Sequence, residues 1–188
     1  MRRGFAELLA DRRGQLEAPH YPEQVAAIVA AMVLAFRSGK KVLWCGNGGS
    51  AADAQHLAAE FSGRFLRERG GLPSEALSVN TSALTAIAND FGYENVFARQ
   101  VEAFAQPGDV IVGITTSGKS PSILRAIEAA RRAGATTVAF TGNGGGPLAD
   151  IADLVLMGPH GYSAIVQEVH ITLGHIICDL VEQDLLFA

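Results

Sequence analysis

The chain has 188 residues, of which 48% are apolar and 18% charged, and its formal net charge is −4. This length is enough for one well-buried core and too short for two comfortable domains, so we predict a single domain over residues 1–188. The negative charge and the lack of clustered Lys and Arg argue against a nucleic-acid partner, because phosphate backbones recruit proteins through such clusters.

The first residues do not have the pattern of a secretory leader. Glu7 follows Met1-Arg2-Arg3 closely, and the charges of residues 11–13 interrupt any apolar run. The two cysteines, Cys45 and Cys178, lie far apart within apolar segments, which predicts two buried free thiols in a reducing compartment; the alternative is a disulfide between them. We therefore expect a cytoplasmic protein with no membrane partner.

The chain opens with helical segments and then alternates between strands and helices. Apolar residues fall at helical spacing from Tyr21 to Arg37, and residues 1–38 are predicted to form an N-terminal helical extension. Residues 41–45 form a short apolar run that predicts a strand. A turn over residues 47–50 follows, and then an Ala-rich helix over residues 51–65.

The same strand, turn and helix unit occurs twice more. A strand over residues 109–114 is followed by a polar turn and by a helix over 121–133 with proline at its start. A strand over 136–140, a glycine-rich turn and a short helix over 147–151 form the third unit. A last strand over 154–157 and a long helix over 163–186 complete the chain. This order predicts an α/β fold, a doubly wound parallel sheet with helices on both faces.

Two of the predicted strands end in turns rich in small polar residues. The turn over 115–120 offers four hydroxyls, free backbone N–H groups and the positive end of a helix dipole, and Ser50 lies in the other turn. Ligands of such sheets bind beyond the carboxyl ends of the strands, so the pair of turns predicts a phosphomonoester site. The alternative is that these Ser and Thr residues only cap a helix.

Two predicted helices carry candidate metal ligands. His56 and Glu60 are four residues apart on the helix after Ser50, which puts both on one face. Gln167 and His175 are eight residues apart on the last helix, again close to one face. Two imidazoles, a carboxylate and an amide oxygen suit a divalent transition ion. The alternatives are a solvated ion pair on the first helix and a core histidine on the second.

Four motifs in register resemble those of the phosphoheptose isomerases, which are members of the SIS-domain family. They are Cys45-Gly-Asn-Gly-Gly-Ser-Ala-Ala-Asp-Ala-Gln-His56 with Glu60, Leu84-Thr-Ala-Ile-Ala-Asn-Asp90, Gly113-Ile-Thr-Thr-Ser-Gly-Lys-Ser120, and Gln167-Glu-Val-His with His175. The resemblance covers nearly the whole chain after about Tyr21. It implies a SIS fold of the flavodoxin-like type, in which N-terminal and C-terminal helices serve oligomerisation.

The resemblance also implies a role for each matching residue. Glu60 and His175 match the acid-base pair, which suits aldose-ketose exchange because that reaction moves a proton between C1 and C2 through an enediol. The implied ligands of one zinc ion are His56, Glu60, Gln167 and His175. The implied substrate-binding residues are Asn47, Gly48, Gly49, Ser50, Glu60, Asn89, Asp90, Thr115, Thr116, Ser117, Ser120 and Gln167.

The chain departs from the family pattern at two positions. Lys119 stands where the family usually has Asn, and it adds a positive charge beside the hydroxyl turn. Ile165 stands where the family commonly has Arg, so an ionic contact made there in the family is missing here. His170 and His160 are interpreted as a helix-packing residue and a loop residue.

These observations lead to one main functional hypothesis and two alternatives. We expect a homo-oligomeric enzyme, a tetramer, that converts sedoheptulose 7-phosphate to D-glycero-D-manno-heptose 7-phosphate in the first step of nucleotide-activated heptose biosynthesis. One alternative is a non-catalytic scaffold that binds a replication-initiator protein, as a relative of these isomerases does. That relative lacks a histidine at the place of His175. The other alternative, a sugar-phosphate-binding regulator, would have no need of Glu60 and His175.

Overall fold

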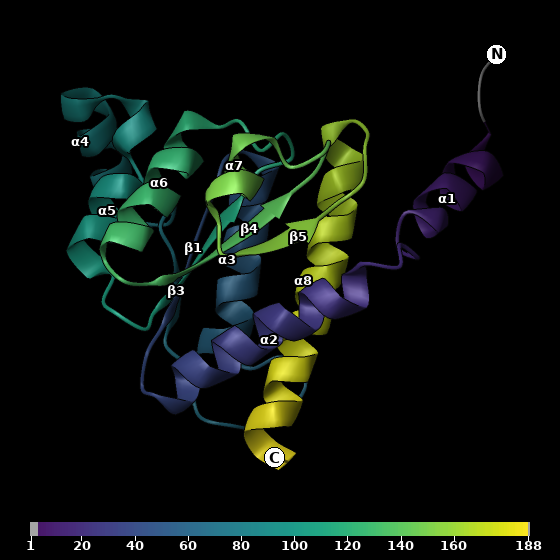
Figure 1. Cartoon of the computed structure of the whole chain (residues 1–188), viewed down its shortest axis with the longest axis horizontal. Coiled ribbons are helices and arrows are strands. Elements are labelled where there is room, and N and C mark those ends of the chain that lie inside the picture. The colour runs from purple at the N-terminus through teal and green to yellow at the C-terminus, as the bar shows by residue number, and fades with distance from the viewer. Residues whose placement is uncertain (1–3, 188) are drawn as a thin grey trace.

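The chain folds around a single sheet of five parallel strands, seen here in a computed structural model that describes residues 4–187. The strand order is β2–β1–β3–β4–β5 (Figure 1). The strands are β1 (Val42–Gly46), β2 (Ser74–Ala76), β3 (Val110–Ile114), β4 (Thr136–Thr141) and β5 (Leu154–Met157). The predicted doubly wound parallel sheet is confirmed. The ends of the predicted 1–188 domain and of its 1–38 extension include residues 1–3 and 188, which lie outside the described range.

Helices precede the sheet and connect its strands. Two, α1 (Phe5–Gly14) and α2 (Tyr21–Arg37), come first, and α1 projects from the body of the molecule (Figure 1). The others are α3 (Gly49–Ser62), α4 (Thr81–Phe91), the short 3-10 helix η1 (Tyr93–Asn95), α5 (Ala98–Phe104), α6 (Pro121–Arg132), α7 (Gly146–Ile151) and α8 (Ser163–Phe187).

The helix predicted over residues 51–65 ends earlier than expected, at Ser62. The backbone N–H groups of Phe65, Leu66 and Arg67 donate to the carboxylate of Glu182, 115 to 117 residues further along the chain. A buried carboxylate therefore takes these N–H groups away from a continuing helix, and residues 63–73 form a loop that leads to β2.

Alternate residues of each strand face two separate cores. On one face, residues such as Val42 and Trp44 of β1 pack with α2, α3 and α8. On the other face, Leu43 and Cys45 pack with α5, α6 and α7. Because both faces are covered, the strands β1 and β3 are buried at every position, which explains their continuous apolar runs. Cys45 and Cys178 are buried free thiols, as predicted.

The sheet reverses its direction of growth between β1 and β3. The chain goes from β1 to β2 on one side, and then returns past β1 to β3, β4 and β5. Ligands of open α/β sheets bind at such a switch point, beyond the carboxyl ends of the two strands. Gly46 pairs with Ile114 at those ends, so the turns after β1 and β3 begin side by side.

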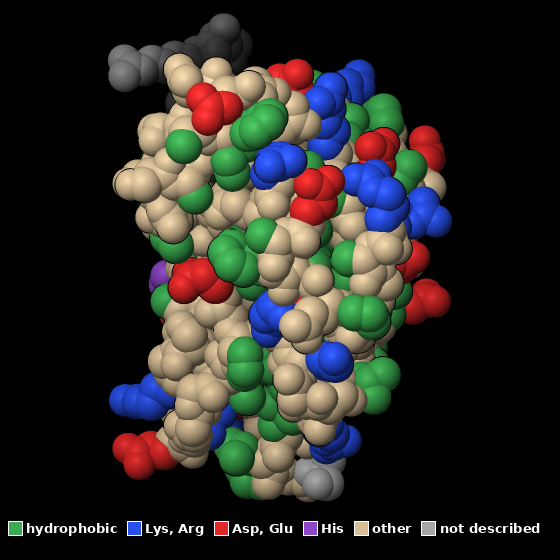
Figure 2. All heavy atoms as spheres, turned by 90° about the vertical axis from the view of Figure 1, so that its left-hand side faces the viewer, with side chains coloured by type: hydrophobic (Ala, Val, Ile, Leu, Met, Phe, Trp, Pro, Cys, Tyr) green, Lys and Arg blue, Asp and Glu red, His purple; other side chains and the backbone are tan. Residues whose placement is uncertain are grey.

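The long helix α8 is apolar enough, by length and composition, to cross a membrane, but half of that stretch is buried within the protein. It packs along α2 and α3, as the core helix of a globular fold does (Figure 1). On the face that carries α4, α5 and α6, basic and acidic side chains are interspersed (Figure 2). That face therefore presents no basic field of the kind that nucleic acid would require.

Candidate active site beyond strands β1 and β3

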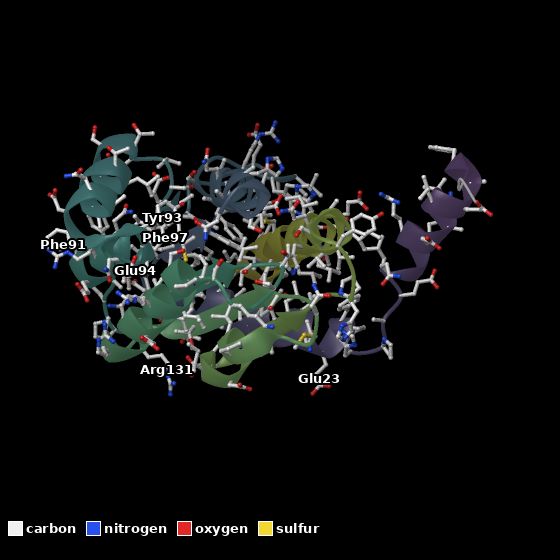
Figure 3. All side chains as sticks on the ribbon, turned by 90° about the horizontal axis from the view of Figure 1, so that it is seen from above. Glu23, Phe91, Tyr93, Glu94, Phe97 and Arg131 are labelled. Carbon is white, nitrogen blue, oxygen red and sulfur yellow. The ribbon has the colours of Figure 1, made fainter. Side chains whose placement is uncertain are left out.

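Asn47, the first residue after β1, connects the two turns that were predicted to form the site. Its Nδ2 donates to Ser122 Oγ at 3.0 Å and lies 3.5 Å from Ser120 Oγ, at the start of α6. The hydroxyl of Tyr93, which comes from η1 between α4 and α5 (Figure 3), donates to Asn47 Oδ1 at 2.9 Å. The amide is thus fixed on both sides, and its orientation is set by neighbours on two other elements.

The hydroxyl turn after β3 surrounds a left-handed glycine. Gly118 has φ +65°, and a Cβ there would lie 1.7 Å from the carbonyl oxygen of Gly145, so the turn packs on the loop after β4 at a distance that only glycine permits. The backbone N–H of Lys119 donates to Ser117 Oγ at 3.3 Å, and Thr115 Oγ1 lies 3.5 Å from the same oxygen. The turn therefore curls its hydroxyls and N–H groups around Ser117.

The helix-cap alternative does not hold for Ser120. This residue occupies the N-cap of α6, but its side chain makes no capping hydrogen bond. Thr116 Oγ1 instead contacts Ser163 Oγ at 3.1 Å, at the start of α8. Thr116 thus faces α8 and Ser120 faces Asn47, and the N-cap of α6 makes no side-chain capping bond.

Three of the four candidate metal ligands meet, namely His56 and Glu60 of α3 and His175 of α8. The Nε2 atoms of His56 and His175 are 2.8 Å apart, and His56 Nε2 lies 3.3 Å from Glu60 Oε1. One potential ligand atom from each of these three residues lies within 4.8 Å of the others. Burial, together with the neighbouring charge of His56, lowers the pKa of His175, while Glu60 acts to raise it. A neutral imidazole is the form that binds a metal or accepts a proton.

The carboxamide of Gln167 lies at the other end of the α3–α8 contact. It packs directly over Gly49, at the first residue of α3, where a Cβ would come within 2.6 Å of its Nε2. Between Gly49 and His56, Asp53 has one carboxylate oxygen, Oδ2, that is buried and has no hydrogen-bond partner among residues 4–187. Burial raises the pKa of Asp53 to about 6, against the opposing effect of His56.

Comparison with known proteins places this chain in a family. The profile of the SIS domain family matches residues 15–142. The chain is 58% identical over 161 residues to the phosphoheptose isomerase of Roseiflexus sp. (strain RS-1), covering 86% of this chain and 82% of that protein. The chain belongs to the phosphoheptose isomerase family. A second member, from Rhodospirillum rubrum, is 48% identical over 186 residues and covers 97% of this chain and 96% of its own length.

Solved structures of the family have the same fold. The phosphoheptose isomerase of Neisseria gonorrhoeae superposes with a TM-score of 0.87 at 41% identity, covering 95% of both chains. That of Francisella tularensis superposes with a TM-score of 0.89 at 33% identity, covering 97% of this chain and all of the other. The comparisons support an isomerase and give no support to the scaffold alternative.

In this family member, the remaining predicted site residues lie at different places. Gly48 and Ser50 flank Gly49 at the start of α3, where Ser50 is buried. Asn89 and Asp90 are exposed at the end of α4, where their side chains bond to each other at 2.8 Å. Of the two departures, Lys119 is exposed, whereas Ile165 is buried at the start of α8.

Two further histidines, His170 and His160, agree with their predicted roles. His170 is buried and contacts the carbonyl oxygen of Thr141 at 3.0 Å, so it packs α8 against the end of β4. His160 lies in the exposed loop before α8.

Sequence analysis missed several residues that shape the site. Tyr93 orients Asn47, and Asn143 fixes the hydroxyl turn by donating from Nδ2 to the carbonyl oxygens of Thr116 and Gly161. Asn143 has φ +53°, a conformation that asparagine tolerates better than most residues. Its place in the third glycine-rich turn was the available signal, because Asn beside Gly often marks a left-handed position.

Proposed function

We propose that this chain isomerises sedoheptulose 7-phosphate to D-glycero-D-manno-heptose 7-phosphate, in the first step of nucleotide-activated heptose biosynthesis. The observation that carries the proposal is the cluster of His56, Glu60 and His175 between α3 and α8. A binding protein or a regulator needs the phosphate turn but has no use for a carboxylate facing two imidazoles. Membership of the phosphoheptose isomerase family supports the same reaction.

The phosphate end of the substrate is bound, in this proposal, by Ser50 and by the hydroxyls of Thr115, Thr116, Ser117 and Ser120. The start of α6, where Ser120 makes no side-chain capping bond, adds the backbone N–H of Ser122 and the positive end of the helix dipole. Asn47, Gly48, Gly49, Asn89, Asp90 and Gln167 contact the sugar hydroxyls. Binding through a phosphate that does not react holds the chain of the sugar in place, so that C1 and C2 reach the catalytic groups.

The chemistry at C1 and C2 is assigned to Glu60 and His175. The carboxylate of Glu60 takes the proton from C1 of the ketose, and the imidazole of His175 moves a proton between the oxygens on C1 and C2 as the enediol forms. The proton is then returned to C2, which yields the aldose. The lowered pKa of His175 suits this role, because the imidazole is neutral at physiological pH and can both accept and donate.

The donor set also fits a divalent ion. Two imidazole nitrogens and a carboxylate oxygen within 4.8 Å of one another are ligands that zinc prefers. The family resemblance implies Gln167 as a fourth ligand, although its carboxamide lies over Gly49 in this structure. When bound, such an ion would polarise the oxygens of the substrate as a Lewis acid. Because a bound cation lowers the basicity of a carboxylate that ligates it, the two proposed roles of Glu60 oppose each other.

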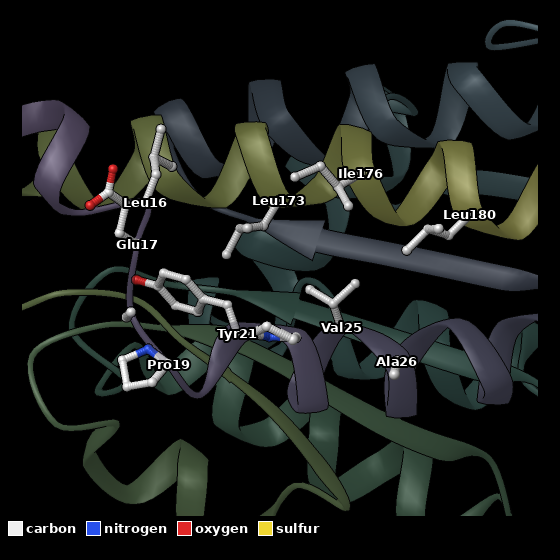
Figure 4. A pocket seen from close by; sticks show the side chains of 11 residues that line it. Leu16, Glu17, Pro19, Tyr21, Val25, Ala26, Leu173, Ile176 and Leu180 are labelled. Atoms are coloured by element: carbon white, nitrogen blue, oxygen red, sulfur yellow. The ribbon is translucent and has the colours of Figure 1, made fainter.

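The proposal extends to assembly and location. The chain acts as one SIS domain with a helical extension over residues 1–38, forms a homotetramer and functions in the cytoplasm. A groove of about 500 Å³ between α2 and α8 supports the assembly, because its lining is mainly apolar and includes Val25, Leu173, Ile176 and Leu180 (Figure 4). Ile176 is 44% exposed in the single chain. Light scattering at micromolar concentration should give a tetramer, and a monomer would refute this part of the proposal.

Glu60→Gln tests the reaction. The variant keeps size and an oxygen ligand but cannot accept a proton, so kcat on sedoheptulose 7-phosphate should fall by about 10²–10⁴-fold. Gln55→Ala is the matched control, because Gln55 is exposed on the same helix and its side chain donates to Ser78 Oγ at 3.3 Å, so its kcat should stay near that of the parent. In heavy water, deuterium should appear at C2 of the product. Near-parental turnover of Glu60→Gln would refute the proposed mechanism, and the absence of deuterium at C2 would argue for hydride transfer instead of an enediol.

A further inference from the structure

The loop that follows α3 is folded around one buried carboxylate. Glu182, on the last turns of α8, has a fully buried side chain. Its Oε1 accepts the backbone N–H of Phe65 at 2.9 Å, and its Oε2 accepts those of Leu66 and Arg67 at 2.9 and 3.0 Å. Three successive N–H groups that converge on one anion fix the path of the backbone over those residues.

Arg69 connects the same carboxylate to the end of α3. Its Nε donates to Glu182 Oε1 at 2.9 Å, while its Nη1 and Nη2 donate to the carbonyl oxygens of Phe61 and Glu60 at 2.8 and 2.7 Å. The guanidinium thus satisfies carbonyl groups that the helix leaves unpaired at its C-terminus. The last turn of α3, which carries Glu60, is therefore tied to α8, which carries His175.

This arrangement lays an aromatic ring on the predicted catalytic imidazole. The rings of Phe65 and His175 are stacked, with centroids 5.4 Å apart and planes 16° from parallel. His56 meets the same imidazole edge-on, with centroids 5.0 Å apart and planes at 75°. The His175 ring is thus in contact with two other rings. Phe65 packs against its face, and the Nε2 of His56 lies 2.8 Å from the Nε2 of His175.

We propose that Phe65 is a positioning residue for His175, held in place by Glu182 and Arg69, so that the loop over residues 63–70 sets the orientation of the imidazole at the reacting carbons. The last side-chain torsion of histidine has broad minima, so packing, and not intrinsic preference, decides where its Nε2 points. A flat ring stacked on the face of the imidazole restrains that torsion. The inference rests on the proposed catalytic role of His175, and it adds a group that does not itself touch the substrate.

Three substitutions in the loop separate this role from general stability. Phe65→Leu keeps an apolar side chain but no flat ring, and Phe65→Tyr keeps the ring. Leu66→Ala is the matched control, because Leu66 makes the same backbone bond to Glu182 while its side chain is 58% exposed. We expect kcat of Phe65→Leu to fall by about 10- to 100-fold, as for a misplaced catalytic group, with KM changed less than about threefold. Phe65→Tyr and Leu66→Ala should remain within about threefold of the parent in both constants.

A second measurement does not depend on turnover. Stacking under the Phe65 ring should shift the imidazole proton signals of His175 upfield in the NMR spectrum, and His175→Gln assigns those signals by their loss. The shift should persist in Phe65→Tyr and Leu66→Ala and disappear in Phe65→Leu. Unchanged His175 signals in Phe65→Leu would overturn the positioning role, whatever the kinetics.

The kinetic comparison distinguishes this inference from the proposed reaction. If His175→Gln abolishes turnover while Phe65→Leu moves the NMR signals without lowering kcat, the stacking is only structural and the inference is wrong. If His175→Gln is as active as the parent, the catalytic assignment of His175 is wrong instead, and the loop then positions a residue that the reaction does not need.

Discussion

Replacing Gly49 with alanine should damage the site through one contact while leaving the fold intact. Gly49 is the first residue of α3, and its φ is not left-handed, so alanine fits the backbone there. The new Cβ, however, would lie 2.6 Å from Nε2 and 2.8 Å from Cδ and Oε1 of Gln167. The flexible end of Gln167 must therefore move, and the backbone need not.

The size of the effect follows from these distances. These distances are roughly 1 Å shorter than the 3.5–4.0 Å at which non-bonded carbon atoms normally pack, so the carboxamide must shift by about 1 Å. Stability should change little, because alanine restricts the unfolded chain more than glycine and so stabilises by roughly 0.4–1 kcal/mol, which offsets the cost of the shift. A displacement of about 1 Å in a group that orients substrate or metal costs about 10²-fold in kcat/KM.

A double-mutant cycle measures this contact. Gly49→Ala should lower kcat/KM about 100-fold, whereas in a Gln167→Ala background the same change should alter it less than about twofold, because the colliding amide is gone. Gly70→Ala is the matched control, since a Cβ at Gly70 meets nothing within 4 Å. An equal loss from Gly49→Ala in both backgrounds would show that the damage does not pass through Gln167, and the reasoning would be wrong.

Three further predictions concern the hydroxyl turn, the metal and pH. Ser117→Ala should raise KM about fivefold with little change in kcat, because one lost hydrogen bond costs about 1 kcal/mol. An unchanged KM in steady-state kinetics would show that Ser117 is structural only. His56→Ala should lose bound zinc by elemental analysis, and if the metal is needed for turnover, activity should be partly restored by added zinc. Burial lowers the pKa of His170 from 6.5 to about 4, so an unfolded chain takes up this proton first as pH falls. The folded state should lose about 3 kcal/mol between pH 6.5 and 4, and about 2 kcal/mol by pH 5, relative to His170→Phe in urea unfolding; equal pH dependence of the two proteins would contradict this. The raised pKa of Asp53, about 6, has the opposite effect, because the folded state binds this proton first and gains stability as pH falls below 6. Asp53 is present in both proteins, so its effect cancels in the comparison.

Local patterns determined much of the fold. The buried runs of β1 and β3, the turns after them and the helices that follow are each encoded within about 20 consecutive residues. The pairing of His56 with Glu60 was predictable for the same reason, because residues four apart on a helix share a face. Sequence analysis assigned no elements between residues 66 and 108. There β2 has only three residues and is a strand because β1 pairs with it, so no periodic pattern marks it.

Contacts between distant segments were decided only by the tertiary structure. His56 meets His175 because α3 and α8 approach closely at Gly174, where a Cβ would lie 2.7 Å from the side chain of Leu57. Glycine lets the two helices come together, and no local pattern specifies which helix will face it. Phe65 was overlooked for a related reason. Its position over His175 depends on a carboxylate 117 residues away that binds its backbone N–H, and a loop held by such a partner carries no periodicity of its own.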